Sequence, residues 1–220
     1  MRTDAAPRPS RVTLEGASID LVPLDADRDG GAIYEATRGA EHDALWTYLF
    51  DGPFADRAAF DASMRRMAAS EDPLYYAIVD RASRHAVGRA ALMRIVPEHR
   101  VIEVGSILYT PPLQRTRGAT EAMYLLARYV FDELGYRRYE WKCNALNEPS
   151  RRAALRLGFT FEGLFRDHMI SKGRSRDTAW FSMLDSEWPA RKRAFERWLQ
   201  PANFNADGQQ VVSLTACRDE

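Results

Sequence analysis

Hydrophobic and polar residues alternate through three consecutive segments near the middle of the chain, at 74–80, 86–96 and 101–109. A period of two is typical of strands that bury one face. Polar turns at 81–85 and 97–100 separate the three segments. We therefore predict an antiparallel meander of three strands.

The segments before this meander show mainly the helical period. Apolar residues recur at helical spacing through 55–69, and shorter helical patterns occupy 27–38 and 41–49. Residues 13–22 instead alternate around an early glycine turn. This last pattern predicts a small hairpin or a first strand with a bend.

The second half of the chain begins with its most apolar helical segment. Residues 118–134 are apolar nearly all round, which predicts a helix buried against the sheet, and Gly135 supplies its C-terminal stop. The remaining predicted elements are a strand at 139–144, a helix at 150–157, antiparallel strands at 159–170 and 178–185, and a closing helix at 188–199.

These elements predict one globular domain, which we place at residues 12–200. Residues 1–11 are rich in proline, arginine and small residues, so we expect a disordered N-terminal lead. Residues 201–220 form a C-terminal tail with an apolar patch from Val211 to Leu214. The patch packs either on its own domain or on a neighbouring copy of the chain. The second alternative would make the protein a homodimer.

Composition narrows the class of protein. The 220 residues are 45% hydrophobic, and the 31 basic residues balance the 31 acidic ones, so no global field favours nucleic acid or an anionic membrane. Two distant cysteines and no apolar signal segment indicate a reducing cytoplasm. The four histidines lack paired ligand spacing, and no apolar run reaches the length of about 18 residues that spans a membrane, so we expect no metal site and no membrane partner.

The stretch from Val101 to Phe159 carries the most informative motif. A strand ending at Tyr109 leads through a turn into the helix that contains Ala119-Thr120-Glu121-Ala122. A helix N-terminus attracts anions through its unpaired N–H groups and its dipole. The segment therefore predicts a phosphate-bearing cofactor.

Further motifs follow it: the strand 139–144, a helix opened by Asn147-Glu148-Pro149-Ser150, and its close at Leu157-Gly158-Phe159. Together these motifs resemble the acetyl-CoA signature of the GCN5-related N-acetyltransferase (GNAT) superfamily, in its RimJ/RimL-like branch. The resemblance implies a mixed α/β GNAT fold, in which helices flank a twisted, mostly antiparallel sheet of about seven strands with a splayed strand pair.

The resemblance also implies an activity. It predicts an enzyme that binds acetyl-CoA and transfers the acetyl group directly, in a ternary complex, to a primary amine. The amine would belong to a small molecule, an amino acid derivative or a peptide N-terminus. A GNAT domain that holds CoA as a sensor or assembly module without turnover is the alternative.

The turn before the helix matches the pyrophosphate loop of this family in two registers. One places Gln114 first and Ala119 last, with Arg117 where glycine is expected; the other places Gly118 correctly but ends on Thr120. We prefer the first, because arginines there add charge-assisted bonds to phosphate. The predicted cofactor-binding residues of the loop are Gln114, Arg115, Thr116, Arg117, Gly118, Ala119 and Thr120.

The resemblance assigns two catalytic roles to the strand 101–109. A bulge near Ile107, Leu108 and Tyr109 is expected to leave a backbone N–H that polarises the thioester carbonyl. Glu103 shares a strand face with Ile107 and Tyr109, so it is the predicted general base. The alternative is an ordinary strand carboxylate.

Ser150 is the predicted general acid for the leaving thiolate. Many relatives use a tyrosine one turn further on, where this chain has Ala154. Ser150 is otherwise an ordinary first-turn capping group, and catalysis then needs no protein acid. Asn147 is the expected N-cap and, by resemblance, binds the pantetheine arm, whereas Cys143 is expected to pack rather than to act as a nucleophile.

The acceptor site is expected around an aromatic loop at 46–54, where Gly52-Pro53 prevents a helix. Trp46, Tyr48, Phe54 and His168 are the predicted substrate-binding residues, because the matching regions frame the acceptor in the family. The alternative for each aromatic residue is a place in the core, and for His168 a solvated strand position.

Overall fold

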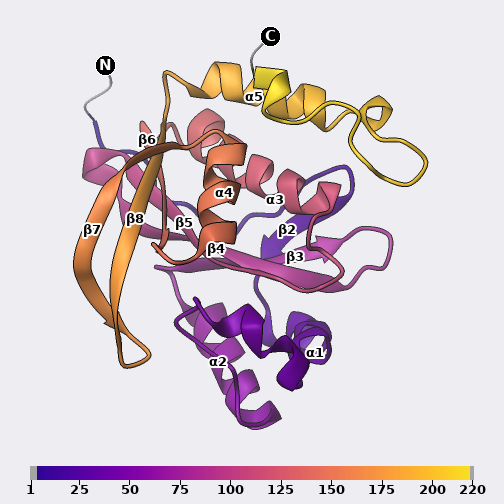
Figure 1. The fold of residues 1–220 in the computed structure, drawn as a ribbon, viewed down its shortest axis with the longest axis vertical. Helices are drawn as coiled ribbons and strands as arrows, with labels where there is room; N and C mark the ends of the chain where they lie inside the picture. The colour runs from indigo at the N-terminus through magenta and orange to yellow at the C-terminus, as the bar shows by residue number, and fades with distance from the viewer. Residues whose placement is uncertain (1–3, 219–220) are drawn as a thin grey trace. The chain divides into compact units, whose positions relative to one another are not determined.

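The computed structural model describes residues 4–218, and they form two compact units (Figure 1). The meander unit comprises residues 8–95 and 103–125. The hairpin unit comprises residues 96–102, residues from 126 onward, and the described part of the first seven residues. Each unit has its own arrangement of strands and helices.

The meander unit carries five strands. Their order is β1-β2-β3-β4-β5, and the pairs from β1 to β4 are antiparallel. The strands are β1 (Leu14–Glu15), β2 (Ile19–Pro23), β3 (Leu74–Asp80), β4 (Ala86–Val96) and β5 (Val101–Tyr109), with the short 3₁₀ turn η2 (Pro97–His99) before the last. The alternating segments thus begin and end where their pattern predicts.

Three helical segments pack on one face of this meander (Figure 1). They are α1 (Ala26–Thr37), η1 (Ala40–Trp46) and α2 (Arg57–Ala69). The segment predicted as a helix at 41–49 is a 3₁₀ helix, which ends at Trp46, just before the aromatic loop. Their apolar side chains form one core with the strands: Leu24, Ile33, Trp46, Phe60, Met64, Met67, Ala77, Ala86 and Leu108.

Helix α3 (Arg117–Arg128) continues into a π-helical turn, η3 (Tyr129–Glu133). The sequence predicts one helix to residue 134, but the backbone widens at the end, where the Leu134 N–H donates to the Tyr129 carbonyl over 3.0 Å. Gly135 follows with φ of 66°, which is the left-handed stop that the sequence predicts.

A buried carboxylate fixes the start of α3 to the first strands. Glu121 is 4% exposed and accepts bonds from the backbone N–H groups of Ala17 and Ser18 and from the Ser18 hydroxyl. Beside it, a Cβ on Gly118 would lie 2.9 Å from Ile19 Cγ2. The close approach of α3 to β2 therefore requires glycine at position 118.

The hairpin unit carries three antiparallel strands in the order β6-β8-β7 (Figure 1). They are β6 (Arg138–Asn144), β7 (Thr160–Ser171) and β8 (Arg174–Leu184), accompanied by α4 (Glu148–Leu157) and α5 (Trp188–Trp198). Four of the five elements lie within two residues of their predicted bounds, whereas β8 begins four residues earlier than predicted, at Arg174. Strand β7 is the edge strand of this order, and most of its side chains are exposed.

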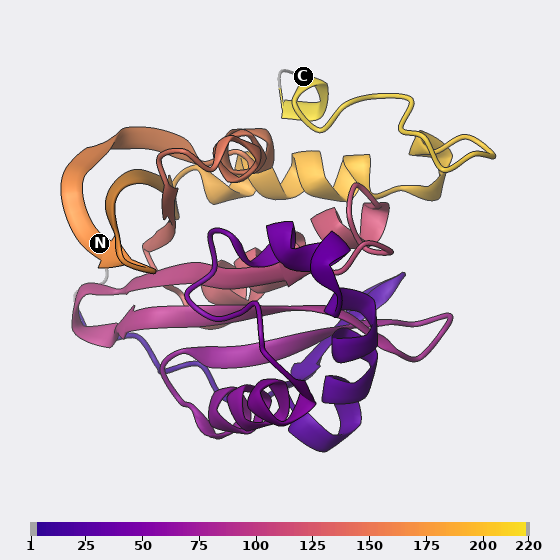
Figure 2. The same ribbon diagram turned by 60° about the horizontal axis from the view of Figure 1, so that its bottom comes forward.

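The C-terminal tail runs back along α5 (Figure 2). It contains the 3₁₀ turns η4 (Pro201–Asn203) and η5 (Ala216–Arg218). Leu214 is 1% exposed, so this end of the apolar patch packs on its own unit, whereas Val211 is 69% exposed. The side chain of Arg218 adds a bond to the Leu155 carbonyl over 3.0 Å.

The described part of the N-terminal lead also makes specific bonds. In the hairpin unit the Ala6 N–H donates to the Pro97 carbonyl over 3.0 Å, and Ala6 is buried. In the meander unit the Arg11 guanidinium donates to the Ser70 carbonyl over 3.0 Å. Between residues 4 and 218, no helix has the length and apolarity that a membrane span requires.

We predict that Glu121→Ala lowers the free energy of unfolding by about 3 kcal/mol, because it leaves two partly buried N–H groups without their charged acceptor. Urea unfolding followed by circular dichroism measures this loss. The control is Glu35→Ala, which removes an exposed carboxylate paired with Arg38 and costs less than about 1 kcal/mol. Equal losses for the two variants would contradict the tie between α3 and the first strands.

Candidate functional site

Strand β5 contains a residue of unusual backbone conformation, next to the segment where the family resemblance implies a bulge. Ser106 has φ of 51°, a left-handed conformation typical of a residue in a β-bulge. It precedes Ile107 and Leu108, the expected carbonyl-binding residues. The irregular backbone therefore lies one residue earlier than the segment named from the sequence.

Glu103 lies on the same strand, three residues before the bulge. Its side chain is 5% exposed, and Oε2 lies 3.2 Å from Nε of Arg94. A Cβ on Gly105 would lie 3.5 Å from Glu103 Oε1, so residues 103 and 105 share a face as predicted. The ion pair with Arg94 orients this carboxylate on the strand.

Two bonds tie the end of β5 to the loop and helix that follow. The hydroxyl of Tyr109 donates to the Ala119 carbonyl over 3.1 Å, and the side-chain amide of Gln114 donates to the Tyr109 carbonyl over 3.1 Å. The side chains of Tyr109 and Gln114 therefore hold the loop in place. Their predicted role in cofactor binding remains a prediction.

The loop itself has the features of an anion site. Arg115 has φ of 60° and is exposed together with Thr116, while Arg117 begins α3. The Thr116 hydroxyl oxygen accepts from the Ala119 N–H over 3.2 Å and caps the helix. Two guanidinium groups beside a helix N-terminus fit a pyrophosphate.

The last three predicted loop residues are buried. Gly118, Ala119 and Thr120 lie in the first turn of α3 with little exposed side-chain surface. An α-helix leaves the N–H groups of its first turn without carbonyl partners inside the helix. Any bond from these three residues to a phosphate would therefore come from the main chain.

A buried arginine on β4 was not among the residues that we identified from the sequence. Arg89 is 1% exposed and lies in an otherwise apolar strand segment. Its guanidinium contacts Ser106 at the bulge and Asp51 in the aromatic loop. The sequence did contain a signal for it, since Arg89 is the single charged residue in the run from Ala86 to Met93. A charged residue in a buried strand requires specific partners, so it indicates a structural or functional role.

A cavity of about 340 Å³ lies among α1, η1, α2 and the aromatic loop of the meander unit. Two of the predicted acceptor residues, Trp46 and Phe54, line it, with their rings 5.2 Å apart edge to face. Tyr48 is not among the lining residues and is 37% exposed. Other residues that line the cavity are Tyr34, Thr37, Arg38, Asp43 and Phe60.

The hairpin unit holds the predicted general acid. The Ser150 hydroxyl oxygen accepts a bond from the Trp141 indole N–H over 3.0 Å, so the serine keeps its own proton for a second partner. Asn147 caps α4, because its side-chain oxygen accepts from the Ser150 N–H over 3.2 Å. The predicted N-cap is confirmed.

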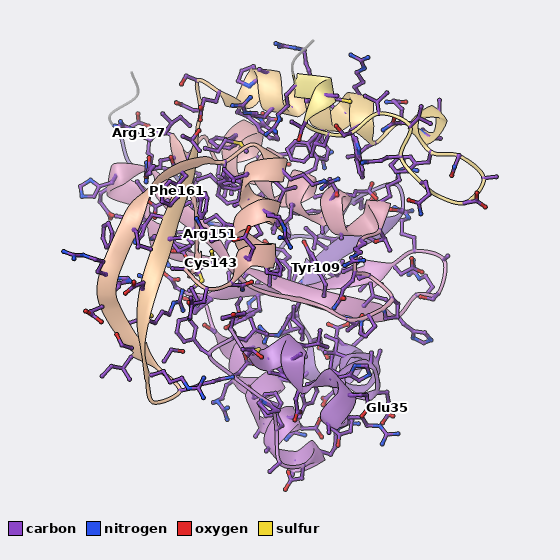
Figure 3. The ribbon with its side chains drawn as sticks, in the orientation of Figure 1. Glu35, Tyr109, Arg137, Cys143, Arg151 and Phe161 are labelled. Carbon is purple, nitrogen blue, oxygen red and sulfur yellow. The ribbon has the colours of Figure 1, made fainter. Side chains whose placement is uncertain are left out.

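Cys143 on β6 is a buried neighbour of Ser150, and Arg151 lies one residue further along α4 (Figure 3). Burial raises the pKa of the Cys143 thiol, although the Ser150 hydroxyl and nearby arginines oppose that shift. A thiol with a raised pKa is protonated at neutral pH and is a poor nucleophile. This agrees with the expected packing role.

His168 lies on β7 of the hairpin unit. Its Nδ1 is 3.0 Å from the Thr178 hydroxyl oxygen, and its ring lies edge to face with Phe165. Trp180 stacks on Phe165 and also receives the Lys142 ammonium 3.9 Å above its ring. Within its unit, His168 is therefore part of an aromatic group on the β7–β8 hairpin, and its role toward an acceptor stays a prediction.

We predict that alkylation of Cys143 by iodoacetamide reaches half its maximal rate above the free-thiol range of about pH 8.5, because only the thiolate reacts. The measurement uses Cys217→Ser, which leaves Cys143 as the single cysteine. Adding Ser150→Ala should move the midpoint further up, since Ser150 opposes the shift. A midpoint below that of a free cysteine would contradict the buried environment.

Comparison with known proteins agrees with this geometry. A family model described as an acetyltransferase (GNAT) domain matches residues 19–160. The crystal structure of a GCN5-related N-acetyltransferase from Brucella melitensis has 50% sequence identity and a TM-score of 0.96, covering 99% of this chain and 98% of that one. A probable GNAT-family acetyltransferase from Chromobacterium violaceum has 40% identity and a TM-score of 0.79, covering 84% and 92%.

A curated relative agrees as well. The uncharacterized N-acetyltransferase YnaD of Bacillus subtilis is 25% identical over 163 residues, which is 73% of this chain and 91% of the relative. The predicted fold, enzyme class and cofactor are confirmed. The sheet has eight strands where about seven were expected, and the two-residue β1 accounts for the difference. The chain therefore belongs to the GNAT superfamily, in its RimJ/RimL-like branch, as an acetyl-CoA-dependent N-acetyltransferase.

Proposed function

We propose that this enzyme acetylates the primary amine of a small molecule, such as an amino acid derivative, by direct transfer in a ternary complex. The observation that carries the proposal is the cavity of about 340 Å³ beside the aromatic loop. A site of this size is at the lower end of the range for small-molecule ligands. Four of the residues that line it are aromatic, and Arg38 and Asp43 are charged groups.

Acetyl-CoA supplies a thioester, whose carbonyl carbon is the electrophile for the amine. Arg115 and Arg117, with the first turn of α3, would hold its pyrophosphate through charge-assisted and main-chain bonds. Asn147 would bind the pantetheine arm, as the family resemblance implies. The N–H groups near Ile107 and Leu108 would stabilise the negative charge that develops on the carbonyl oxygen.

Glu103 would take a proton from the acceptor ammonium, directly or through water, so that the neutral amine attacks. Arg94, whose side chain is 45% exposed, is an ion-pair partner of this carboxylate at 3.2 Å. This contact would hold the Glu103 carboxylate in a fixed orientation before the proton arrives. The proton that Glu103 gains leaves later to solvent.

Ser150 would give its proton to the sulfur as the thioester bond breaks. The Trp141 indole N–H donates to the Ser150 hydroxyl oxygen. The O–H of Ser150 is therefore directed toward a different group, which must be an acceptor. The Ser150 hydroxyl opposes the rise that burial causes in the pKa of the Cys143 thiol, which supports a place for this hydroxyl near a sulfur. A CoA thiolate would present the same kind of acceptor.

We expect the purified protein to release free thiol from acetyl-CoA in the presence of a subset of a pooled library of primary amines. In that assay Glu103→Gln should lower kcat by about 100-fold or more, because an amide cannot accept the ammonium proton. Ser150→Ala should lower kcat by about tenfold, since water can replace a weak acid. Continuous thiol detection with isothermal titration of acetyl-CoA separates turnover from binding.

The outcomes distinguish three classes of protein. Turnover of a ribosomal peptide and of no small amine would contradict the proposed acceptor class. Acetyl-CoA binding without turnover, unchanged by Glu103→Gln, would indicate a CoA-binding module. Glu98→Gln is the matched control, because this exposed carboxylate lies outside the proposed site and the variant should keep wild-type kcat.

We also predict that Arg115→Ala and Arg117→Ala each weaken acetyl-CoA binding about five- to tenfold, through loss of a charged bond to phosphate. The same variants should bind S-acetylpantetheine like the wild type, because that ligand has no pyrophosphate. Arg84→Ala, an exposed arginine in the β3–β4 turn, is the control and should bind both ligands normally. Equal losses for both ligands would place the effect outside the phosphate site.

A further inference from the structure

The guanidinium of Arg89 is desolvated and has its acceptors on two different segments. Nη1 donates to the Ser106 carbonyl over 3.0 Å and to the Ser106 hydroxyl oxygen over 2.6 Å. Nη2 donates to both carboxylate oxygens of Asp51, over 2.9 and 2.7 Å. A cation that is 1% exposed is stable only with such complete pairing.

The side chains of Arg89 and Tyr75 both contact Ser106. The Ser106 hydroxyl donates to the Tyr75 hydroxyl oxygen at 3.5 Å while it accepts from Arg89. The Arg89 guanidinium carbon also lies 5.8 Å from the centre of the Tyr75 ring. Ser106, the residue with the left-handed φ, therefore has both its carbonyl and its side chain bonded to Arg89.

The peptide unit that Arg89 binds is the one that contains the Ile107 N–H. A trans peptide is planar, with its C=O and N–H pointing in opposite directions. Fixing the Ser106 carbonyl toward Arg89 thus fixes the direction of the Ile107 N–H on the other side. A cation on the carbonyl also polarises the whole unit and strengthens that N–H as a donor.

We propose that Arg89 is a positioning residue that orients and polarises the Ile107 N–H, the donor to the thioester carbonyl. This inference rests on the proposed function, in which the N–H groups near Ile107 stabilise the developing oxyanion. Arg89 itself touches no reacting atom in this scheme. It acts through the Ser106–Ile107 peptide unit.

Asp51 extends the same contact to the acceptor side. It lies in the loop 46–54, which also provides Trp46 and Phe54 to the cavity. Its bidentate bond to Arg89 balances the buried charge and holds this loop to the strand with the bulge. The conformation of the loop 46–54 and the direction of the Ile107 N–H therefore both depend on the Arg89 guanidinium.

The test combines kinetics with infrared difference spectroscopy of bound acetyl-CoA labelled with ¹³C at the thioester carbonyl. In the wild type, donation by Ile107 should shift the carbonyl band to lower frequency. Arg89→Met and Arg89→Lys should lose most of this shift and lower kcat about 10- to 100-fold, with the Kd for acetyl-CoA within about twofold. Lysine keeps the charge but lacks the fork that reaches both Ser106 and Asp51.

Two further variants keep the test informative if Arg89→Met does not fold. Ser106→Gly removes the hydroxyl but keeps the carbonyl in a conformation that glycine adopts readily, so the band shift should persist. Asp51→Asn keeps one acceptor oxygen for Arg89, replaces the other with a donor and removes the negative charge, so it should give an intermediate loss of kcat. Thermal unfolding of each variant sets the assay below its transition.

Arg81→Lys is the matched control. Like Arg89, Arg81 donates to a backbone carbonyl, that of Gly16 at 2.8 Å, and to a carboxylate, that of Asp20 at 3.0 Å, but it lies in the β3–β4 turn. This control should keep both the band shift and kcat.

Folded Arg89 variants that retain the wild-type shift overturn the inference, even if their kcat falls. A wild type that transfers acetyl groups with no band shift overturns the carbonyl donor of the proposed function as well. If the wild type shows the band shift but transfers acetyl groups to no amine, the spectra still support the role of Arg89. That outcome contradicts the proposed acceptor class instead.

Discussion

The burial of one positive charge on β4 constrains the meander unit more than any other single interaction. An unpaired guanidinium inside a protein is too costly to persist, so the chain around Arg89 must supply acceptors at fixed places. The bulge at Ser106 supplies two of them and the aromatic loop supplies the others through Asp51. The need to pair the Arg89 guanidinium therefore fixes the positions of both the loop 46–54 and Ser106.

A second buried charge, on Glu121, organises another part of the same unit. Glu121 binds the turn before β2, and Gly118 lets the start of α3 approach that strand. These contacts determine where the first turn of α3 and its loop arginines lie. The position of the groups proposed to bind the pyrophosphate is therefore a result of helix packing, and the loop provides their charge.

The regular elements of this chain were predictable because their signal is local. Strands β3, β4 and β5 begin and end as their alternation indicates, and Asn147 caps α4 as its residue type indicates. Departures occur where distant contacts decide the backbone. The η3 turn widens to a π-helix, and the tail packs its Leu214 into its own unit, which the sequence left open.

The sequence by itself determined the strand and helix order, the anion-binding turn and the family resemblance, because alternation, helical spacing and short motifs depend on neighbouring residues. Only the tertiary structure showed that Arg89 holds Ser106, that Trp141 directs the Ser150 hydroxyl, and that Trp46 and Phe54 share a cavity. The first two pairs are separated by 17 and 9 residues, and the third arises from a ring packing that no local pattern encodes. A buried polar group is satisfied by whichever partner the fold brings within reach, and that choice is made by packing.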